Sequence, residues 1–216
     1  KGNFPTYIVP KTDETRLQSA NRILNEINGK LVYITEKEDG TSFTAYYNGE
    51  FGFCSRNLEQ KNGPTNQSIY AKIVQQYKLD SKLEAYYYSY NIHLAIQGEI
   101  TGDGINKNPL GLPRNTYQLH IFNVWDIDHQ KYFDYIDSLD IVNNMGLDFV
   151  KIIECSVFNY TLEQLLEKAK GKYIGTKNHR EGIVIRPTTE IYSEVLHGRM
   201  SFKVINNDYL LKDKKI

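Results

Sequence analysis

The chain has 216 residues, and its 26 Lys and Arg residues balance its 26 Asp and Glu residues. Hydrophobic residues make up 40%, with 17 Tyr and 9 Phe, which excludes a disordered chain. The apolar runs are too short for a membrane-spanning helix, and the zero net charge offers no global field for nucleic acid. The length predicts one domain with its own core.

The two cysteines and the first residues bear on the cellular location of the protein. Cys54 and Cys155 lie in apolar neighbourhoods, which favours reduced thiols over a disulfide or a metal site. The start, KGNFPTYIVP, has neither an initiator Met nor the apolar core of a signal peptide, so we expect further sequence upstream. We therefore expect an intracellular protein, located in the cytoplasm, with the nucleus as the alternative.

The first half of the chain mixes helical and strand patterns. Apolar residues from Leu17 to Ile27 recur at helical spacing behind capping residues, and predict a helix over about 13–28 that stops at Gly29. Alternating β-branched and aromatic residues predict strands within 31–57, with a hairpin at Asn48-Gly49. Apolar positions 69, 73, 74 and 77 predict a second helix, and YNIHLAIQGEI predicts a strand that enters a glycine-rich loop.

The second half continues with a strand in YQLHIFNVWDI and a region over about 131–170 that we predict to be helical. In that region Thr161 and Gln164 stand in capping-box register, and Gly171 provides a stop. EGIVIRP and MSFKVIN predict two closing strands. Strands and helices do not alternate regularly, so the order favours an α+β fold with mainly antiparallel sheets over a doubly wound fold.

Charged residues interrupt several strands that otherwise look buried. Glu99 follows an apolar strand, Glu181 opens Gly-Ile-Val-Ile, and Lys203 stands between Phe202 and Val204. Taken singly, strand-end carboxylates are usually solvated, and Lys203 can be a gatekeeper of an edge strand. Buried charges are costly unless they are paired or bound to ions. Together these residues favour one polar cleft, suited to a divalent metal and a phosphate-bearing ligand.

The segment EKEDG adds a lysine among carboxylates. Period-two geometry places Lys37 and Asp39 on one face of their strand, with Glu36 and Glu38 on the other. Other site signatures are missing: the sequence has no phosphate-binding G-x-x-x-x-G-K-[ST] loop, no G-x-G-x-x-G after a strand and no G-x-S-x-G elbow. The five histidines lack metal-ligand spacing.

EKEDG resembles the K-x-D-G signature of the covalent nucleotidyltransferases, the superfamily of ATP-dependent DNA ligases, RNA ligases and mRNA capping enzymes. Further segments resemble the later signatures of the superfamily in their usual order: CSRN at 54–57, QGEITGDGIN, IFNVWDI, EGIVIR and SFKVINNDYL. The resemblance runs from about residue 11 to the end of the chain. KTDETRLQ, the G-x-G-I-N-x-N loop and FKVIN followed by Tyr-Leu are similar to the Deinococcus-type RNA ligase family.

The resemblance implies an α+β nucleotidyltransferase fold, ATP-grasp-like, with two mainly antiparallel sheets flanked by helices around an ATP cleft. Residues 1–216 would form this single domain, and the family carries an OB-fold domain ahead of it. The implied activity is ATP-dependent RNA ligation through a lysyl-AMP intermediate, with AMP passing to a 5′-phosphate end that is then sealed to a 3′-OH. The implied cofactors are ATP and Mg²⁺ or Mn²⁺. The implied partners are RNA or RNA/DNA strand ends in a nicked duplex. The protein is expected to be a monomer and not to associate with membranes.

The resemblance also implies roles for individual residues. Lys37 would be the nucleophile, and Phe122 would lie flat against adenine, with core packing as its alternative role. The other catalytic residues would be Asp39, Glu99, Glu181 and Lys203, of which the three carboxylates would hold the metal, largely through its waters. The nucleotide would be bound by Glu36, Arg16, Gln18, Gly40, Arg56, Phe122 and Lys203.

The chemistry raises one objection to Lys37 as the nucleophile. The fifth motif raises a second objection, because it puts some of the capacity to neutralise phosphate charge in doubt. Free lysine titrates near ~10.4, so its ammonium form imposes a handicap of about 4 kcal/mol at neutral pH. Adjacent carboxylates add to it, unless Glu36 and Glu38 point away and a hydrated metal occupies Asp39. The fifth motif has one lysine, in Ser201-Phe202-Lys203, where many ligases have two. The alternatives are a DNA ligase or a capping guanylyltransferase, or a non-catalytic module that binds nucleotides or RNA ends.

Overall fold

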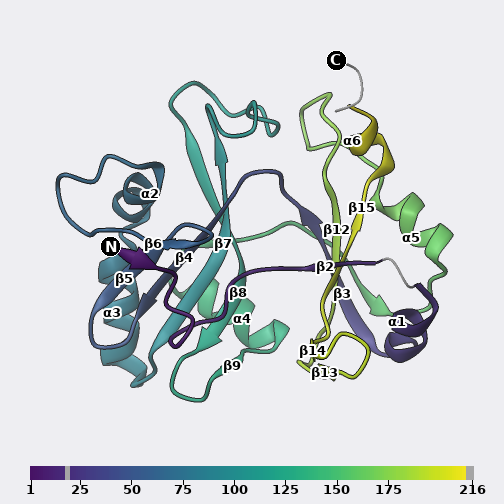
Figure 1. Cartoon of the computed structure of the whole chain (residues 1–216), viewed down its shortest axis with the longest axis horizontal. Coiled ribbons are helices and arrows are strands. Elements are labelled where there is room, and N and C mark those ends of the chain that lie inside the picture. The colour runs from purple at the N-terminus through teal and green to yellow at the C-terminus, as the bar shows by residue number, and fades with distance from the viewer. Residues whose placement is uncertain (18–19, 213–216) are drawn as a thin grey trace.

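Two β-sheets and the helices packed against them make up the computed structural model, which describes residues 1–17 and 20–212, without the side chains of residues 20 and 21. Figure 1 shows one sheet on the left with α2, α3 and α4, and the other on the right with α1, α5 and α6. The predicted α+β class with mainly antiparallel sheets is confirmed. The helices are α1 (Ala20–Ile27), α2 (Ile69–Tyr77), α3 (Leu79–Tyr90), α4 (Tyr135–Asn144), α5 (Leu162–Ala169) and α6 (Asn207–Lys212).

The larger sheet has eight strands, and its pairs are antiparallel except for β10 beside β8. In spatial order the strands are β1 (Gly2–Asn3), β6 (Leu58–Glu59), β5 (Phe51–Cys54), β4 (Thr41–Tyr47), β7 (Leu94–Gly102), β8 (Tyr117–Asp126) and β10 (Asp148–Phe149), with β9 (Lys131–Tyr132) paired to β8. Its apolar face, which includes Phe43, Ile96 and Ile121, packs against buried residues of α2, α3 and α4. The hairpin expected at Asn48-Gly49 is confirmed by the β4–β5 pairing.

The smaller sheet has five strands and a separate core. Its order is β11 (Ile152–Val157), β3 (Leu31–Lys37), β12 (Gly182–Pro187), β15 (Phe202–Ile205) and β2 (Thr15–Arg16). Ile34, Ile185 and Phe202 are fully buried against α1 and α5. A short ribbon of β13 (Tyr192–Ser193) and β14 (Gly198–Arg199) completes the described strands.

Three details of the predicted elements need correction. Of the helix expected over 13–28, the structure describes Ala20–Ile27 as helical, while residues 15 and 16 are not helical because they pair in parallel with β15 as an edge strand. The region over 131–170 is helical only in α4 and α5, since β11 between them extends the smaller sheet beside β3. Helix α3 was not predicted. The capping box of α5 is confirmed, with Thr161 Oγ1 accepting from the Gln164 amide and the Gln164 side chain accepting from the Thr161 amide.

The chain passes from the smaller sheet to the larger one at a single tight turn. Strand β3 ends at Lys37 and β4 begins at Thr41, so residues 38–40 connect the two sheets. Gly40 lies so close to β7 that a Cβ atom there would be 2.2 Å from the Ile100 carbonyl oxygen, which only glycine avoids. This crossing places Lys37 between the sheets. Among the described helices, none is long and apolar enough to cross a membrane.

Candidate active site

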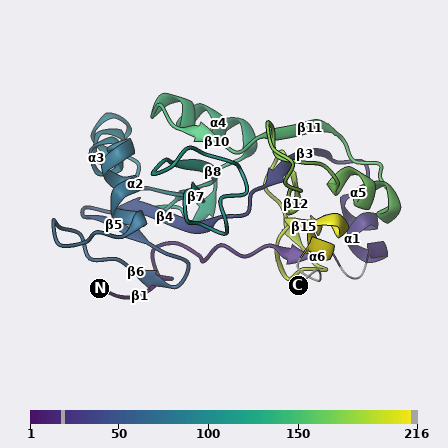
Figure 2. The same ribbon diagram turned by 90° about the horizontal axis from the view of Figure 1, so that it is seen from above.

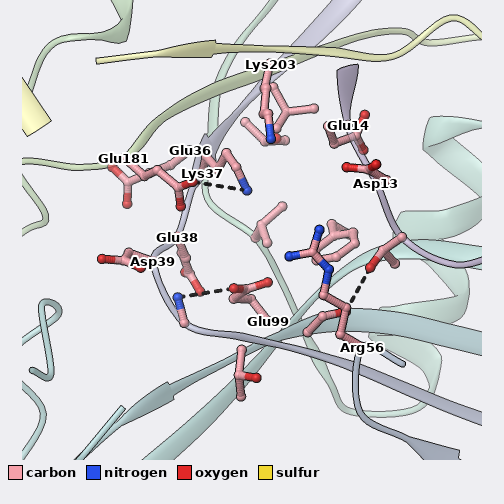
Figure 3. Close-up of a pocket in the computed structure, with 18 of the residues that line it drawn as sticks. Asp13, Glu14, Glu36, Lys37, Glu38, Asp39, Arg56, Glu99, Glu181 and Lys203 are labelled. Carbon is pink, nitrogen blue, oxygen red and sulfur yellow. Dashed lines mark hydrogen bonds and ion pairs between the residues drawn. The ribbon is translucent and has the colours of Figure 1, made fainter. Parts of the chain in front are cut away.

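A cavity lies between the two sheets, and side chains from both sheets line it (Figure 3). From the smaller sheet come Lys37 at the end of β3, Glu181 just before β12, and Lys203 on β15. The larger sheet contributes Glu99 from β7 and Phe122 from β8. The polar cleft expected from charges on separate strands is therefore present.

The Lys37 side chain points into this cavity (Figure 3). Its Nζ lies 3.7 Å from Glu181 Oε1, and each of the two side chains is 21% exposed. Lys203 reaches into the same cavity from β15 (Figure 3), and its charge acts on Glu181 as well. A lysine so placed is mostly shielded from water and can still be reached by a ligand.

The two carboxylates Glu99 and Glu181 are energetically costly in the free protein. Burial raises the pKa of Glu99 to about 7, with Lys37 opposing and Glu181 adding to the shift. Burial also raises the pKa of Glu181, against the opposing charge of Lys37. The Gly40 amide donates to Glu99 Oε1 at 3.1 Å and fixes that carboxylate at the crossing turn. A cation bound between these groups would restore their charged forms.

Asp39 belongs to the crossing turn, since β3 ends two residues earlier, so the alternation expected for a continuous strand does not reach it. Its Oδ1 accepts a hydrogen bond from Asn106 Nδ2 at 2.8 Å, and its Oδ2 lies 3.1 Å from the Tyr209 hydroxyl. Within the described part of the chain, no group of three or more His, Cys, Asp or Glu is close enough to hold a metal directly. Asp39, Glu99 and Glu181 all line the cavity, and this donor set fits a hydrated cation held through water.

The carboxylates of Glu36 and Glu38 pair with Arg180 and His120, which are not among the residues that line the cavity. Glu36 and Glu38 themselves line it and are buried, at 6% and 5% exposure. Each has a hydrogen-bonding partner: Arg180 Nη1 lies 3.4 Å from Glu36 Oε2, and His120 Nδ1 lies 2.5 Å from Glu38 Oε1. Burial lowers the pKa of His120, but the hydrogen bond and charge of Glu38 outweigh it and raise the pKa overall. These partners offset the carboxylates that flank Lys37.

The nucleotide-binding candidates are distributed unevenly. Phe122 lines the cavity together with Val150 and Val184, which gives it an apolar part, and Arg56 turns its guanidinium into the cavity (Figure 3). Arg16 is exposed and lies opposite Lys203 in the β2–β15 pairing, but it is not among the residues that line the cavity. Gln18 lies outside the described residues.

The structure also brings in residues that sequence reasoning missed. Arg186 on β12 is 3% exposed, donates to the Phe122 carbonyl at 2.6 Å and pairs with Glu14. Ser201 joins the same network, since it accepts from Arg186 Nε at 2.9 Å and donates to Glu14. The serine that stands where many ligases have a lysine is therefore part of a buried network. Arg186 carried the same signal as Glu181, a charge in a buried strand.

Tyr173 was also missed. It lies in the irregular segment between α5 and β12, and its hydroxyl contacts the backbone of Lys37, Asp39 and Glu181. No periodicity or local motif distinguishes this tyrosine from the other 16 in the chain, because its contacts join segments far apart in sequence.

Comparisons with known proteins agree with this arrangement. The model of the RNA ligase family matches residues 30–205. A Naegleria gruberi RNA ligase variant solved with ATP and Mn is 32% identical, with a TM-score of 0.84 over 99% of this chain and 60% of that chain. A second Naegleria variant, with AMP and Mn, is 31% identical, with a TM-score of 0.84 over 100% of this chain and 61% of that one.

A third structure, the Naegleria ligase with PPi, is 32% identical, with a TM-score of 0.84 over 100% of this chain and 60% of that one. This chain thus spans about 60% of the length of these relatives. A search of curated proteins found no match. The family match covers most of the chain and includes Lys37, Glu99, Glu181 and Lys203. This chain belongs to the RNA ligase family.

Proposed function

We propose that this chain is the catalytic domain of an ATP-dependent RNA ligase, and that its first step attaches AMP to Lys37. The observation that carries the proposal is the position of Lys37, whose amine enters a cavity shared with Glu181, Lys203 and Arg56. A module that only binds a nucleotide has no use for a nucleophile so placed. The match to structures solved with ATP, AMP and PPi supports the same chemistry.

In the first step the neutral Lys37 amine attacks the α-phosphorus of ATP. A nitrogen–phosphorus bond forms, the bond to the β-phosphate oxygen breaks, pyrophosphate leaves, and the amine loses a proton. Lys203 and Arg56 would contact the phosphates and stabilise the charge that builds up on their oxygens. Arg16, beside Lys203 in the sheet, stays a candidate for the same role.

The adenosine would occupy the apolar part of the cavity. Phe122 would lie against adenine. Arg186 would hold Phe122 in place, because it donates a hydrogen bond to the Phe122 carbonyl and its Cζ atom lies 5.9 Å from the Phe122 ring centroid. Glu36 lines the same cavity, and Gly40 allows the close approach of the crossing turn to β7. The family also suggests Glu99 for the ribose hydroxyls.

Asp39, Glu99 and Glu181 would hold Mg²⁺ or Mn²⁺, largely through its waters. When bound, the metal supplies positive charge that favours the neutral lysine and stabilises the transferring phosphate. The raised pKa values of Glu99 and Glu181 support this assignment, because burial disfavours their charged forms and a bound cation would favour them.

In the later steps an oxygen of an RNA 5′-phosphate attacks the phosphorus of lysyl-AMP, and Lys37 leaves. A 3′-OH then attacks the activated 5′-phosphate, and AMP leaves.

We infer a Deinococcus-type RNA ligase that acts as a monomer on strand ends in a nicked RNA or RNA/DNA duplex. This inference rests on the resemblance of the KTDETRLQ and G-x-G-I-N-x-N segments to that family. An intracellular, cytoplasmic location is supported by the free thiols Cys54 and Cys155. The upstream OB-fold domain stays a prediction.

The test is the intact mass of the purified chain before and after incubation with ATP and Mg²⁺ or Mn²⁺. We expect a gain of one AMP that pyrophosphate reverses, and no gain in Lys37→Ala. Lys168→Ala is the matched control, because Lys168 pairs with Glu154 outside the cavity and should leave the gain intact. No gain with any nucleoside triphosphate, in a folded chain that binds ATP, would contradict the proposal. Transfer of AMP from the loaded protein to nicked RNA, nicked DNA and single strands then identifies the substrate.

A further inference from the structure

The pairing of β3, which ends at Lys37, with β12, which follows Glu181, ends beside the cavity. Strands β3 and β12 are antiparallel, and the last register pair is Lys37 with Gly182. Gly182 packs so tightly against β15 that a Cβ atom there would be 2.1 Å from the Val204 carbonyl oxygen. Beyond this pair the ladder does not continue, so the backbone groups of Asp39 and Glu181 need other partners.

The Tyr173 hydroxyl supplies these partners. It accepts from the Asp39 amide at 3.0 Å and from the Glu181 amide at 3.1 Å, and it donates to the Lys37 carbonyl at 2.9 Å. One donated and two accepted hydrogen bonds use the full capacity of a phenol oxygen. A single oxygen atom therefore joins the nucleophile, the middle residue of the crossing turn and the residue just before β12.

Tyr173 is itself held firmly and away from the ligand space. Its side chain is 2% exposed, and it is not among the residues that line the cavity. Its backbone closes a turn, donating to the Asn178 carbonyl at 3.1 Å and accepting from the Thr176 amide at 3.1 Å. Burial raises the pKa of Tyr173, so the phenol keeps the proton that it donates to Lys37.

We propose that Tyr173 is a positioning residue for AMP attachment to Lys37, an inference that rests on the proposed function. It acts through the backbone, since it holds the Lys37 carbonyl together with the amides of the two carboxylate residues Asp39 and Glu181. Displacement of a reacting group by about 1 Å can cost about 100-fold in rate, so a shared backbone anchor matters for the chemical step. Phe122, which the proposed function places against adenine, lies on β8 of the larger sheet, so we expect ATP binding to depend little on this anchor.

The test is Tyr173→Phe, which removes one oxygen and keeps the ring. We expect the single-turnover rate of AMP attachment at saturating ATP to fall about 10- to 100-fold, while the ATP concentration that gives half of the maximal rate changes less than about 3-fold. The matched control is Tyr77→Phe, because the Tyr77 hydroxyl accepts a backbone amide, that of Leu119 at 3.1 Å, outside the cavity. This control should attach AMP at the wild-type rate.

The outcomes separate the two proposals. If the wild-type chain gains no AMP, the proposed function fails. If the wild-type chain gains AMP and Tyr173→Phe matches its rate, the positioning role alone is wrong. An equal slowing in Tyr77→Phe would also overturn it, because the loss would then follow from the general removal of a buried hydroxyl.

A measurement on the wild-type chain covers the case in which Tyr173→Phe does not fold. Hydrogen exchange, read by NMR, should show the Asp39 and Glu181 amides protected at least 100-fold relative to an unstructured peptide, since both donate to the buried phenol. Exchange of both amides at the unstructured rate would overturn the inference.

Discussion

At the scale of single residues, the cavity collects charges that are unfavourable in the free protein. Glu99 and Glu181 are shielded from water, and their raised pKa values show the energetic cost. Glu36 and Glu38 have Arg180 and His120 as partners, which limits the negative charge next to Lys37. Glu99 and Glu181 are two of the three carboxylates to which the proposed function assigns a metal.

This cost predicts a pH-dependent effect of Glu99→Gln on stability. The pKa of Glu99 is about 7 in the folded protein and 4.5 in the reference state, so the folded chain binds more protons between these values. The wild-type chain therefore loses stability as the pH rises from 4.5 to 7, whereas the glutamine does not titrate. Without metal, we expect Glu99→Gln to be more stable by about 1–3 kcal/mol above pH 7, and equal to wild type below pH 4.5.

Urea unfolding in EDTA at several pH values measures this difference. Ser42→Ala is a suitable control, because Ser42 pairs with Glu99 in register and does not titrate. A difference that does not depend on pH would show that Glu99 does not titrate in this range. The same Glu99→Gln variant should lose AMP attachment.

At the scale of elements, local capping and long-range pairing each decide different boundaries. Helix α5 begins at Leu162 because its cap is complete in four consecutive residues. The helical pattern that precedes α1 does not make residues 15 and 16 helical, because they pair with β15. Pairing in a sheet can thus override a helical pattern of apolar residues. Local spacing does not reveal this pairing, because the partner residues lie almost 190 positions away in the sequence.

The cap predicts that Thr161→Ala destabilises the protein by about 1 kcal/mol. The substitution removes the hydroxyl that accepts from the Gln164 amide at 3.2 Å. Urea unfolding measures the loss, and Thr65→Ala, at an exposed position outside the helices, should show no comparable loss. Because α5 packs on the outer side of the smaller sheet, the rate of AMP attachment should not change; a slower rate would mean that α5 influences the cavity.

At the scale of the whole molecule, two arginines donate hydrogen bonds to β8 of the larger sheet from other sheets. Arg186 of the smaller sheet donates to the Phe122 carbonyl of β8, and Arg199 of β14 donates to Asn123 Oδ1 at 2.7 Å. Figure 2 shows the two sheets side by side, with the chain passing between them from β3 to β4. The walls of the cavity therefore belong to separate cores, which are joined by polar contacts and by the chain at residues 38–40 and 150–151.

This arrangement predicts a large effect of Arg186→Met. Removal of the arginine leaves the Glu14 carboxylate without its ion-pair partner, and the loss of one partner of a buried pair costs about 3–5 kcal/mol. The double variant Glu14→Gln with Arg186→Met should recover part of this loss, because no unpaired charge remains. Urea unfolding of both single variants and the double variant measures the coupling. Additive losses would contradict the assignment of a shared network.

Much of this molecule could be predicted from local sequence. The hairpin at Asn48-Gly49, the cap at Thr161, and the strands around Glu99 and Glu181 depend on neighbouring residues, and the structure has all of them. The segment 131–170 was predicted wrongly, because β11 is an edge strand that forms only beside β3. The shared cavity was predicted because charged residues occur in several otherwise apolar strands. One polar cleft lined by all of these side chains accounts for them together.

The sequence by itself determined the fold class, the polar cleft and the lysine at its centre, because strand periodicity and embedded charges are local signals. Only the tertiary structure decided which side chains pair with Glu36 and Glu38, and that Asp39 belongs to a turn held by Asn106. It also decided the role open to Tyr173, whose hydroxyl joins residues 136, 134 and 8 positions away. The physical reason is that hydrogen bonds act over about 3 Å in space, and no local pattern records which distant segments come that close.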